Sequence, residues 1–307
     1  MKISIVISTY NGEKYIVDQM ESLRLQSRAA DEVLFFDDCS SDNTVQIIKD
    51  YINKYQLTTW KLTENAQNKG WKKNFIEGMW EATGDLIFPC DQDDIWMLNK
   101  LSELENIMKN HPEIELLTTN VEAFYDNGSI IIKPEKEDNQ IIKQSLNSAV
   151  FDIRYPGCTY CARKCLIDRS KLYWEDDFPH DALLWRMAMF SETLNSYNKS
   201  LIKWRRHNDS SYTLESIKSK TFSSKRKWLI YAQRVIKSLI KYVENEKCTN
   251  SDNKISILNE NMQWLIYRAS FYDTKNVFTG IKLLKYRKYY MKFKQYLGDW
   301  YLIYFQK

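Results

Sequence analysis

The strongest chemical signal in the sequence is a pair of carboxylates separated by one residue, Asp91 and Asp93. They follow the stretch 85–90, which is typical of a buried strand, and they precede the apolar pair 95–96, an unusual neighbour for a solvated turn. Two carboxylates in a loop can face one hard cation such as Mg²⁺ or Mn²⁺, which fills its remaining positions with phosphate and water. The same triplet also occurs in plain surface turns, so the pair alone leaves both interpretations open.

A second acidic pair, Asp37 and Asp38, follows the apolar stretch 32–36. One interpretation is capping of a helix predicted at 44–55, although the run 40–42 (Ser-Ser-Asp) could cap that helix without them. The two carboxylates would then accept hydrogen bonds from a nucleotide base or from ribose hydroxyls.

Asp181 stands at the start of an apolar helix predicted at 182–192. A carboxylate there is stabilised in its ionised form by the helix dipole and could act as a general base. The simpler alternative is a helix cap.

Arg205 and Arg206 end a short strand predicted at 201–206, and His207 follows them. Adjacent guanidinium groups can hold phosphate, and the histidine could contact a metal or the same phosphate. Taken alone, His207 is more typical of an ordinary surface or core histidine.

Cys158, Cys161 and Cys165 have a spacing that is compatible with zinc. A fourth ligand at a matching spacing is missing, since His180 is fifteen residues further on. We therefore expect reduced, partly buried thiols.

Strands and helices alternate along the first part of the chain, which predicts βαβ units and a mostly parallel, doubly wound sheet flanked by helices. Ligands of such sheets bind beyond the carboxyl ends of the strands, where Thr9, Asp37 and Asp91 are expected to converge. Strands are expected at 2–8, 32–36, 59–62, 85–90, 115–125, 129–133 and 201–206, and helices at 13–25, 44–55, 72–82, 98–110, 182–192, 225–247, 257–272 and 280–297.

Charge is distributed unevenly over the 307 residues. Residues 1–222 carry a net charge of −7, from 27 Lys and Arg against 34 Asp and Glu, whereas 223–307 carry +11, from 17 against 6. This asymmetry predicts a catalytic domain over 1–222 and a basic, aromatic helical extension over 223–307. The extension could lie on an anionic membrane surface or could pack its apolar face internally. The acidic first part argues against nucleic acid as a partner.

Composition narrows the class of protein further. With 44% hydrophobic residues the chain can bury a sizeable core, and it holds no apolar run of the roughly 20 residues that a membrane-spanning helix needs. The N-terminus has no small-residue cleavage site, so we expect a cytoplasmic protein, with membrane contact limited to the inner face.

Five motifs occur in order along roughly residues 1–215. They are VISTYNGEKY (6–15), FFDDCSSDNT (35–44), NKGWKKNFIEGMWEATGDLIFPCDQDDIW (68–96), PHD (179–181) and RRHNDSS (205–211). Together they resemble the inverting family 2 glycosyltransferases of GT-A fold. The DQDDIW form is similar to that of rhamnosyltransferase-like enzymes of bacterial surface-polysaccharide synthesis.

The resemblance implies a nucleotide-binding half over about 1–97 and an acceptor half over about 98–222. It implies Asp93 as metal ligand, His207 as a metal or diphosphate contact and Asp181 as catalytic base. Cys39 departs from the glycine that the family usually has there, which puts the tightness of this turn in doubt. The nucleotide-binding residues that the resemblance implies are Thr9, Tyr10, Glu13, Asp37, Asp38, Asn68, Gly70 and Asp91.

The implied function is metal-dependent transfer, with Mn²⁺ or Mg²⁺, of a sugar from a UDP- or dTDP-sugar to a hydroxyl of a growing bacterial surface glycan. The glycan would belong to a capsule, an O-antigen or a similar polymer, and its acceptor end could be carried on a lipid diphosphate. One alternative is a sugar-nucleotidyltransferase, although the stretch 8–15 offers only one Gly and one Lys for a triphosphate loop. Another is a non-catalytic scaffold, against which the presence of both Asp93 and Asp181 argues.

Overall fold

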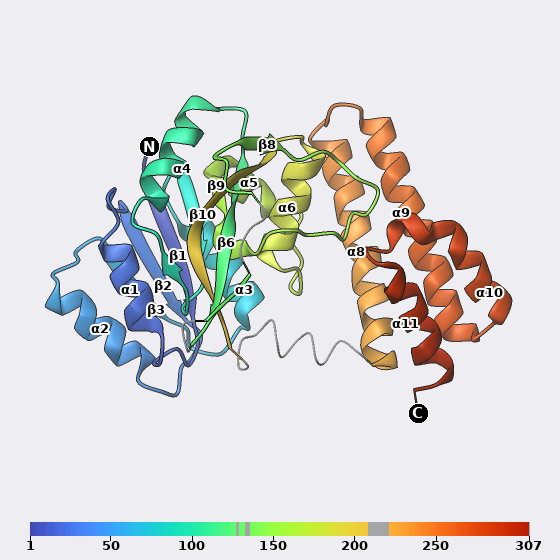
Figure 1. The fold of residues 1–307 in the computed structure, drawn as a ribbon, viewed down its shortest axis with the longest axis horizontal. Helices are drawn as coiled ribbons and strands as arrows, with labels where there is room; N and C mark the ends of the chain where they lie inside the picture. The colour runs from blue at the N-terminus through green and yellow to red at the C-terminus, as the bar shows by residue number, and fades with distance from the viewer. Residues whose placement is uncertain (127–128, 133–135, 208–220, 307) are drawn as a thin grey trace. The chain divides into compact units, whose positions relative to one another are not determined.

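The structure is a computed structural model that describes residues 1–126, 129–132, 136–207 and 221–306 (Figure 1). The chain forms two compact units: Met1–Gln144 with Tyr155–Arg206, and Ser145–Arg154 with His207–Lys307. The segment Ser145–Arg154 therefore belongs with the helical unit, although it lies inside the predicted catalytic stretch. The division near residue 97 stays a prediction.

The first unit is built on one mixed sheet in the order β3-β2-β1-β4-β9-β6-β10-β5, with β7 beside β6 and β8 beside β10. Strands β1 to β4 run parallel, as the alternation of strands and helices predicted. The strands are β1 (Ile3–Thr9), β2 (Glu32–Asp37), β3 (Trp60–Glu64), β4 (Leu86–Cys90), β5 (Ile95–Trp96), β6 (Leu116–Tyr125), β7 (Ile130–Ile132), β8 (Ile141–Lys143), β9 (Cys161–Arg163) and β10 (Leu194–Arg206).

Helices cover both faces of this sheet (Figure 1). Alternate residues of β1 (Ile3, Ile5, Ile7) share one core cluster with α1 (Ile16–Arg24), α2 (Thr44–Lys54) and α4 (Lys100–Asn110). On the opposite face α3 (Trp71–Glu81) packs so closely that a methyl group on Gly78 would meet Phe36 and Val6. The 3₁₀ turn η1 (Gly157–Thr159) and the helices α5 (Lys164–Ser170) and α6 (His180–Phe190) complete the unit. This arrangement confirms the predicted α/β fold.

The register of the parallel strands brings three loops to one edge. Thr9 pairs with Asp37, and Ile7 pairs with Cys90, so β1, β2 and β4 end at nearly the same level. The predicted hairpin is also present, since β6 and β7 pair antiparallel, but residues 127–128 and 133 lie outside the described residues.

The second unit consists of α8 (Phe222–Asn245), α9 (Ser251–Thr274), α10 (Val277–Lys282), the 3₁₀ helix η2 (Leu283–Tyr289) and α11 (Phe293–Tyr304). The prediction of one helix over 280–297 was wrong, because Tyr290 and Lys292 have extended backbone conformations. None of the described helices combines the length and the apolar character that crossing a bilayer requires.

A buried ion pair explains this break. The carboxylate of Asp299 accepts bonds from Arg268 Nε and Nη2 at 2.6 and 2.7 Å, from Tyr272 Oη at 2.7 Å and from Tyr290 Oη at 3.0 Å. The Tyr290 ring also lies 4.9 Å from the Arg268 guanidinium, and a ring of Trp264 lies 5.2 Å from it. Turning Tyr290 inward to complete this cluster ends η2, and no glycine or proline marks the position.

We expect Asp299→Asn to destabilise the helical unit by about 3–5 kcal/mol, because it leaves the buried Arg268 without its counter-charge. Denaturant unfolding followed by far-UV circular dichroism measures the loss. The matched control is Asp273→Asn, which removes a solvent-exposed ion pair with Arg226 and should cost less than about 1 kcal/mol. Equal losses in the two variants would contradict a structural role for the Asp299 cluster.

Candidate functional site

The first loop at the shared edge is fixed by Asp37. Its carboxylate accepts bonds from Thr9 Oγ1 at 2.9 Å, from Ser40 Oγ at 2.6 Å and from the Ser40 amide at 2.8 Å. Both Asp37 and Thr9 are buried. These groups therefore join the ends of β1 and β2 and shape the turn that follows.

Asp38 fixes the loop that precedes α3. Its carboxylate accepts bonds from the amides of Lys69 and Gly70 at 2.7 and 2.8 Å and from Asn65 Nδ2 at 3.0 Å, while Asn68 Nδ2 donates to the Asp38 carbonyl at 2.9 Å. Gly70 has a φ of 79°, a conformation that favours glycine. The structure thus brings the predicted residues Asp38, Asn68 and Gly70 together, with the carboxylate already engaged by the protein.

Tyr10 and Glu13 lie on the loop after β1 and are solvent-exposed. The Gln92 side chain makes two hydrogen bonds with the Tyr10 backbone. Its Oε1 accepts from the Tyr10 amide at 2.9 Å, and its Nε2 donates to the Tyr10 carbonyl at 3.0 Å. Glu13 Oε2 accepts from the amide and side chain of Asn43 at 3.0 and 2.9 Å. The loops after β1, β2 and β4 therefore form one bonded edge.

Carboxylates gather where β4 ends. Among the described residues, one group of potential metal ligands has its donor atoms within 4.8 Å of each other: Asp91, Asp94 and Cys158. Burial, then Asp93 and Asp181, raise the pKa of Asp91 to about 7. Burial with Asp93 and Asp91 raises the pKa of Asp94 well above its usual value. Four carboxylates thus interact electrostatically at this point, and three of them are the predicted Asp91, Asp93 and Asp181.

Two buried cations offset this negative charge. Lys100 Nζ donates to the Cys158 carbonyl at 2.8 Å and lies 3.6 Å from the centre of the Trp96 ring, and burial lowers its pKa to about 8. The Arg205 backbone amide donates to Asp94 Oδ1 at 2.9 Å, and its Nε donates to the Asp93 carbonyl at 2.8 Å.

The rest of the Arg205 guanidinium is also engaged. It donates to Asp126 at 3.4 Å and to Asp18 at 3.1 Å, and it lies 4.7 and 4.8 Å from the rings of Tyr15 and Phe124. A phosphate contact through Arg205 would require these bonds to be exchanged. In this structure the residue positions the Asp93–Asp94 segment.

Asp181 lies in the first turn of α6 rather than at its N-cap, which is Pro179. The turn at Gly157 packs against it, since a methyl group there would lie 2.9 Å from Asp181 Cβ and 3.0 Å from His180 Nε2. His180 is buried against Phe75, with ring centroids 4.4 Å apart, and burial lowers its pKa. Gly157 and Cys158 thus connect the predicted base with the carboxylates after β4.

The remaining predicted residues lie at the end of the first unit and beyond it. Arg206 ends β10, with its guanidinium 4.4 Å from the Trp204 ring. His207 belongs to the second unit, and residues 208–211 of its motif lie outside the described residues. The zinc alternative gains no support, because Cys161 and Cys165 are absent from the ligand group found among the described residues.

Sequence reasoning missed four residues that shape this site: Gln92, Lys100, Asp94 and Cys158. Asn74 is a fifth, since its side chain donates to Ser8 Oγ and to the Phe36 carbonyl, both at 2.7 Å. Asp94 was visible as the last acidic residue of the DQDD motif. Gln92 lies in the same motif, and Cys158 was noted only for its spacing from other cysteines. Lys100 and Asn74 carried no signal, because single polar residues in helices are ordinarily solvated.

The turn at Cys39 has the geometry that its motif position implies. Cys39 adopts a φ of 65°, in the left-handed region that glycine adopts most easily, and its thiol lies 3.1 Å from the Asn65 carbonyl. The tight turn is therefore kept with cysteine in place of glycine, at a cost in backbone strain.

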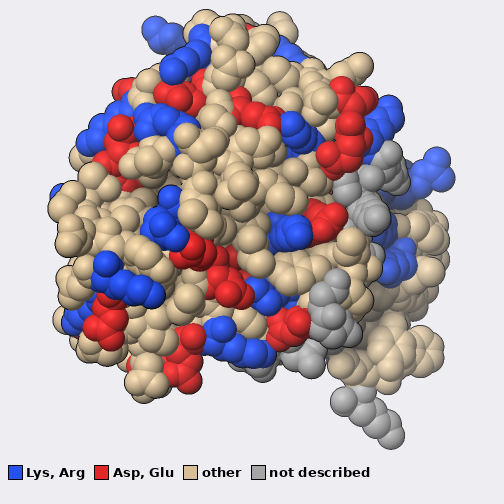
Figure 2. Space-filling view, turned by 60° about the vertical axis from the view of Figure 1, so that its left-hand side comes forward, with Lys and Arg blue, Asp and Glu red and all other residues tan. Residues whose placement is uncertain are grey.

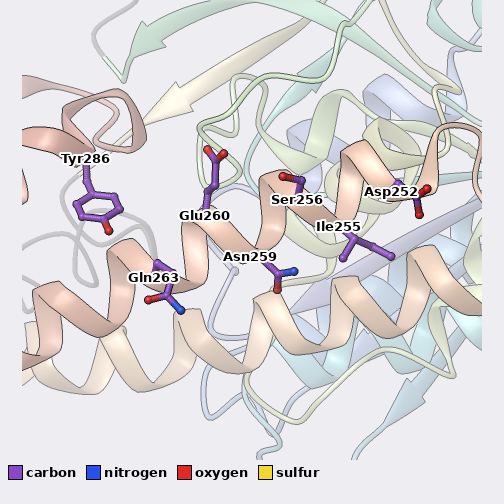
Figure 3. Close-up of a pocket in the computed structure, with 7 residues that line it drawn as sticks. All are labelled: Asp252, Ile255, Ser256, Asn259, Glu260, Gln263 and Tyr286. Atoms are coloured by element: carbon purple, nitrogen blue, oxygen red, sulfur yellow. The ribbon is translucent and has the colours of Figure 1, made fainter.

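Two surface hollows stand out in the described structure. One of about 420 Å³ lies beside the loop that Asp38 fixes and is lined by Gln67, Lys69, Lys73 and Asp176. The other, of about 460 Å³, lies along α9 in the second unit beside Tyr286 and contains no predicted site residue (Figure 3). On the face seen in Figure 2, acidic and basic side chains are interspersed in small groups.

The profile of the family described as Glycosyl transferase family 2 matches residues 4–172, more than half of the chain. The chain belongs to glycosyl transferase family 2. The match includes β1 to β4, both acidic pairs and Cys158, and it ends before Asp181.

Two relatives illustrate the range of this family. The chain is 34% identical over 119 residues to the poly(ribitol-phosphate) beta-N-acetylglucosaminyltransferase TarS of Staphylococcus aureus, which covers 38% of this chain and 20% of that protein. It is 29% identical over 202 residues to the dTDP-rhamnosyl transferase RfbG of Shigella flexneri, which covers 62% of this chain and 66% of that protein. The matches thus span a fifth of TarS and just under two thirds of RfbG.

Solved structures of transferases share the fold. The structure of S. aureus TarS 1–349 in complex with UDP-GlcNAc matches with a TM-score of 0.60 and 17% identity, over 95% of this chain and 93% of that one. The mannosyltransferase PcManGT of Pyrobaculum calidifontis, in complex with GDP-Man and Mn²⁺, matches with a TM-score of 0.57 and 15% identity, over 98% and 85%. The fold is therefore of GT-A type.

We expect Gly157→Ala to lower turnover by about tenfold to a hundredfold, because the added methyl group displaces Asp181. It should also cost about 1–3 kcal/mol of stability through overpacking. The matched control is Gly298→Ala in α11, where a methyl group would meet nothing within 4 Å, so turnover should be unchanged. Steady-state kinetics and thermal unfolding of both variants test this expectation, and normal turnover by Gly157→Ala would contradict the close contact.

The raised pKa of Asp91 predicts that cation binding depends on pH. Because this carboxyl is largely protonated below pH 7 and only its ionised form attracts a nearby divalent cation or a water bound to it, affinity for Mn²⁺ should be up to about tenfold weaker at pH 6 than at pH 8. Isothermal titration calorimetry at the two pH values measures this ratio, and Asp91→Asn should reduce it. An unchanged affinity in the wild-type protein would show that the charge of Asp91 does not contribute to cation binding.

Proposed function

We propose that the protein is a metal-dependent inverting glycosyltransferase that moves a sugar from a UDP- or dTDP-sugar to a hydroxyl of a growing bacterial surface glycan. The observation that carries this proposal is that Asp181 lies close enough to Asp91 to raise its pKa. Asp91 and the neighbouring Asp93 follow the carboxyl end of β4. A base and a set of cation ligands at one place are what a single displacement at a sugar–phosphate bond requires.

The residues present fit a divalent cation. Asp94 Oδ2 is buried and has no hydrogen-bond partner among the residues that the structure describes, and Asp91 and Asp93 add negative charge beside it. Carboxylate oxygens are the ligands that Mg²⁺ and Mn²⁺ prefer, whereas burial keeps the Cys158 thiol protonated by raising its pKa. We propose Asp93 as the direct ligand, with Asp91 bound to a metal-held water or to the ribose. When bound, the cation would neutralise charge on the diphosphate leaving group.

The chain's own residues would carry out the other parts of the reaction. Asp181 takes the proton of the acceptor hydroxyl as that oxygen forms its bond to the anomeric carbon, and the bond from this carbon to the diphosphate oxygen breaks. It would do so from the first turn of α6, which fixes its position beside the Gly157 turn. The Gly157 turn packs against both Asp181 and its neighbour His180, which would hold the carboxylate in place.

The loops at the same edge would bind the donor. Asp37 and Asp38 hold the turn after β2 and the 65–70 loop, so that Thr9, Tyr10, Glu13, Asn68 and Gly70 are presented together. Asp38 Oδ2 accepts a single bond from the protein, which leaves it capacity for a ribose or base contact. Arg206 and His207 remain the proposed diphosphate contacts.

The relatives support this choice of substrates. TarS and RfbG are named for transfer from N-acetylglucosaminyl and dTDP-rhamnosyl donors, and the solved neighbours hold UDP-GlcNAc or GDP-Man. We propose that the acceptor is carried on a lipid diphosphate at the inner face of the cell membrane. The stretch 8–15 offers only one Gly and one Lys for a triphosphate loop, which disfavours a nucleotidyltransferase, and a scaffold has no use for a held base.

Asp181→Asn tests the proposal directly. It should leave donor binding nearly intact. Turnover should fall by a factor of ~10²–10⁴, because no carboxylate remains to take the proton of the acceptor hydroxyl. Release of nucleoside diphosphate in the presence of acceptor measures turnover, and a donor titration measures binding. The control is Asp168→Asn in α5, where a half-exposed carboxylate pairs with Lys164 and Lys171. Unchanged turnover by Asp181→Asn would remove this residue as the base.

A further inference from the structure

The second unit exposes large apolar side chains along α11. Phe293, Leu297, Tyr301 and Phe305 follow each other at intervals of four residues and are 54%, 53%, 59% and 72% exposed. Residues four apart lie on one face of a helix, so these side chains form a continuous stripe. The Tyr301 and Phe305 rings are stacked, with centroids 6.4 Å apart.

The neighbouring segment, α10 with η2, exposes a second apolar set. Val277, Phe278, Ile281 and Leu284 are 48%, 75%, 50% and 42% exposed. The segment packs against α11 through Gly280, since a methyl group there would lie 2.5 Å from the Trp300 ring. Tyr296 Oη also donates to the Gly280 carbonyl at 3.2 Å. The two sets therefore belong to one packed element, which we call the C-terminal platform (277–305).

The platform differs from α8, the other basic amphipathic segment of this unit. On α8 the apolar side chains are buried or half-buried, and Ile230 is the one large apolar side chain that is exposed. The apolar face of α8 thus packs inside the helical unit, which is one of the two alternatives that its sequence left open. Unlike α8, the platform exposes several large apolar groups to water, which is unusual for a surface that contacts nothing.

Charge indicates what the platform contacts. Over 277–305 the one acidic residue is Asp299, which is buried and paired with Arg268. Of the basic residues there, Lys288 alone has an ion-pair partner among the described residues, Glu260. The basic residues are Lys282, Lys285, Arg287, Lys288, Lys292 and Lys294. Unpaired cations interspersed with exposed aromatic and aliphatic side chains are complementary to a surface that is both anionic and apolar.

We propose that the C-terminal platform binds an anionic lipid bilayer, with its apolar side chains at the boundary of headgroups and acyl chains and its lysines at the lipid phosphates. Interfacial helices combine the same features, namely an apolar face, aromatic rings and Lys or Arg beside them. Protein–protein interfaces are depleted in lysine, which makes a protein partner a poorer match for this surface. The inference stands on the helical unit alone. Its use for presenting a lipid-linked acceptor rests on the proposed function.

Sedimentation of the full chain with vesicles tests the proposal. We expect binding to vesicles of phosphatidylcholine with 30% phosphatidylglycerol, weak binding to pure phosphatidylcholine, and a loss of binding as salt is raised. Lys285→Glu and Lys294→Glu should each weaken binding about tenfold or more, because a cation near an anionic surface contributes about fivefold and each reversal also adds a repelled charge. Phe278→Ser and Phe293→Ser should each weaken it about fivefold or more.

The controls lie on α8, where Lys237→Glu and Ile230→Ser change exposed side chains of the same kinds and should leave vesicle binding unchanged. Failure of the wild-type chain to bind anionic vesicles would overturn the proposal, as would equal losses in the α8 and platform variants. Sedimentation velocity adds a further outcome, because a dimer that only the platform variants dissociate, without vesicle binding, would show that this surface pairs two copies of the chain. Donor binding by the platform variants, followed by thermal shift, separates a failure of the membrane proposal from a failure of the proposed function. Normal donor binding without vesicle binding would contradict only the membrane proposal.

Discussion

Mutual repulsion of carboxylates beyond the end of β4 is the constraint on which the rest of the site depends. Asp91, Asp93 and Asp94 follow one short strand, and Asp181 acts on Asp91 from another element. Like charges at such separations, partly removed from water, raise each other's pKa and store unfavourable energy. Such a group is stabilised when a positive charge compensates it, and here a bound divalent cation would supply that charge.

The protein itself compensates part of this negative charge through Lys100 and Arg205. These two residues come from distant parts of the chain, and so they link those parts to the acidic loop. Lys100 comes from α4, which follows the acidic loop directly. Arg205 comes from the end of β10, more than a hundred residues later, and donates to the backbone of Asp93 as well as to Asp18 in α1. Removing either cation would leave buried carboxylates unbalanced. The acidic loop is therefore held by both the early and the late parts of the chain.

The sequence predicted the elements whose patterns are local. Apolar runs ending in Asp37 and in Asp91 located the strands and their shared edge, because the side-chain pattern of a buried parallel strand is plain in the sequence. It could not show that Asp38 would be occupied by loop amides, or that Cys158 would lie against Asp91, since both depend on contacts between distant segments. The break after Tyr290 was missed for the same reason: a buried partner, Asp299, causes it, and local propensity does not.

The measurement that tests the account most directly is a thermal-shift screen of nucleoside diphosphates and their sugar conjugates, with and without Mn²⁺. A ligand at about 100 times its dissociation constant adds about 2.7 kcal/mol, which such a screen detects readily. We expect UDP or dTDP and its sugar conjugate to stabilise the wild-type protein only when the cation is present, and to lose this effect in Asp93→Ala. Stabilisation by a nucleoside triphosphate alone, or an unchanged cation-dependent shift in Asp93→Ala, would contradict the central claim.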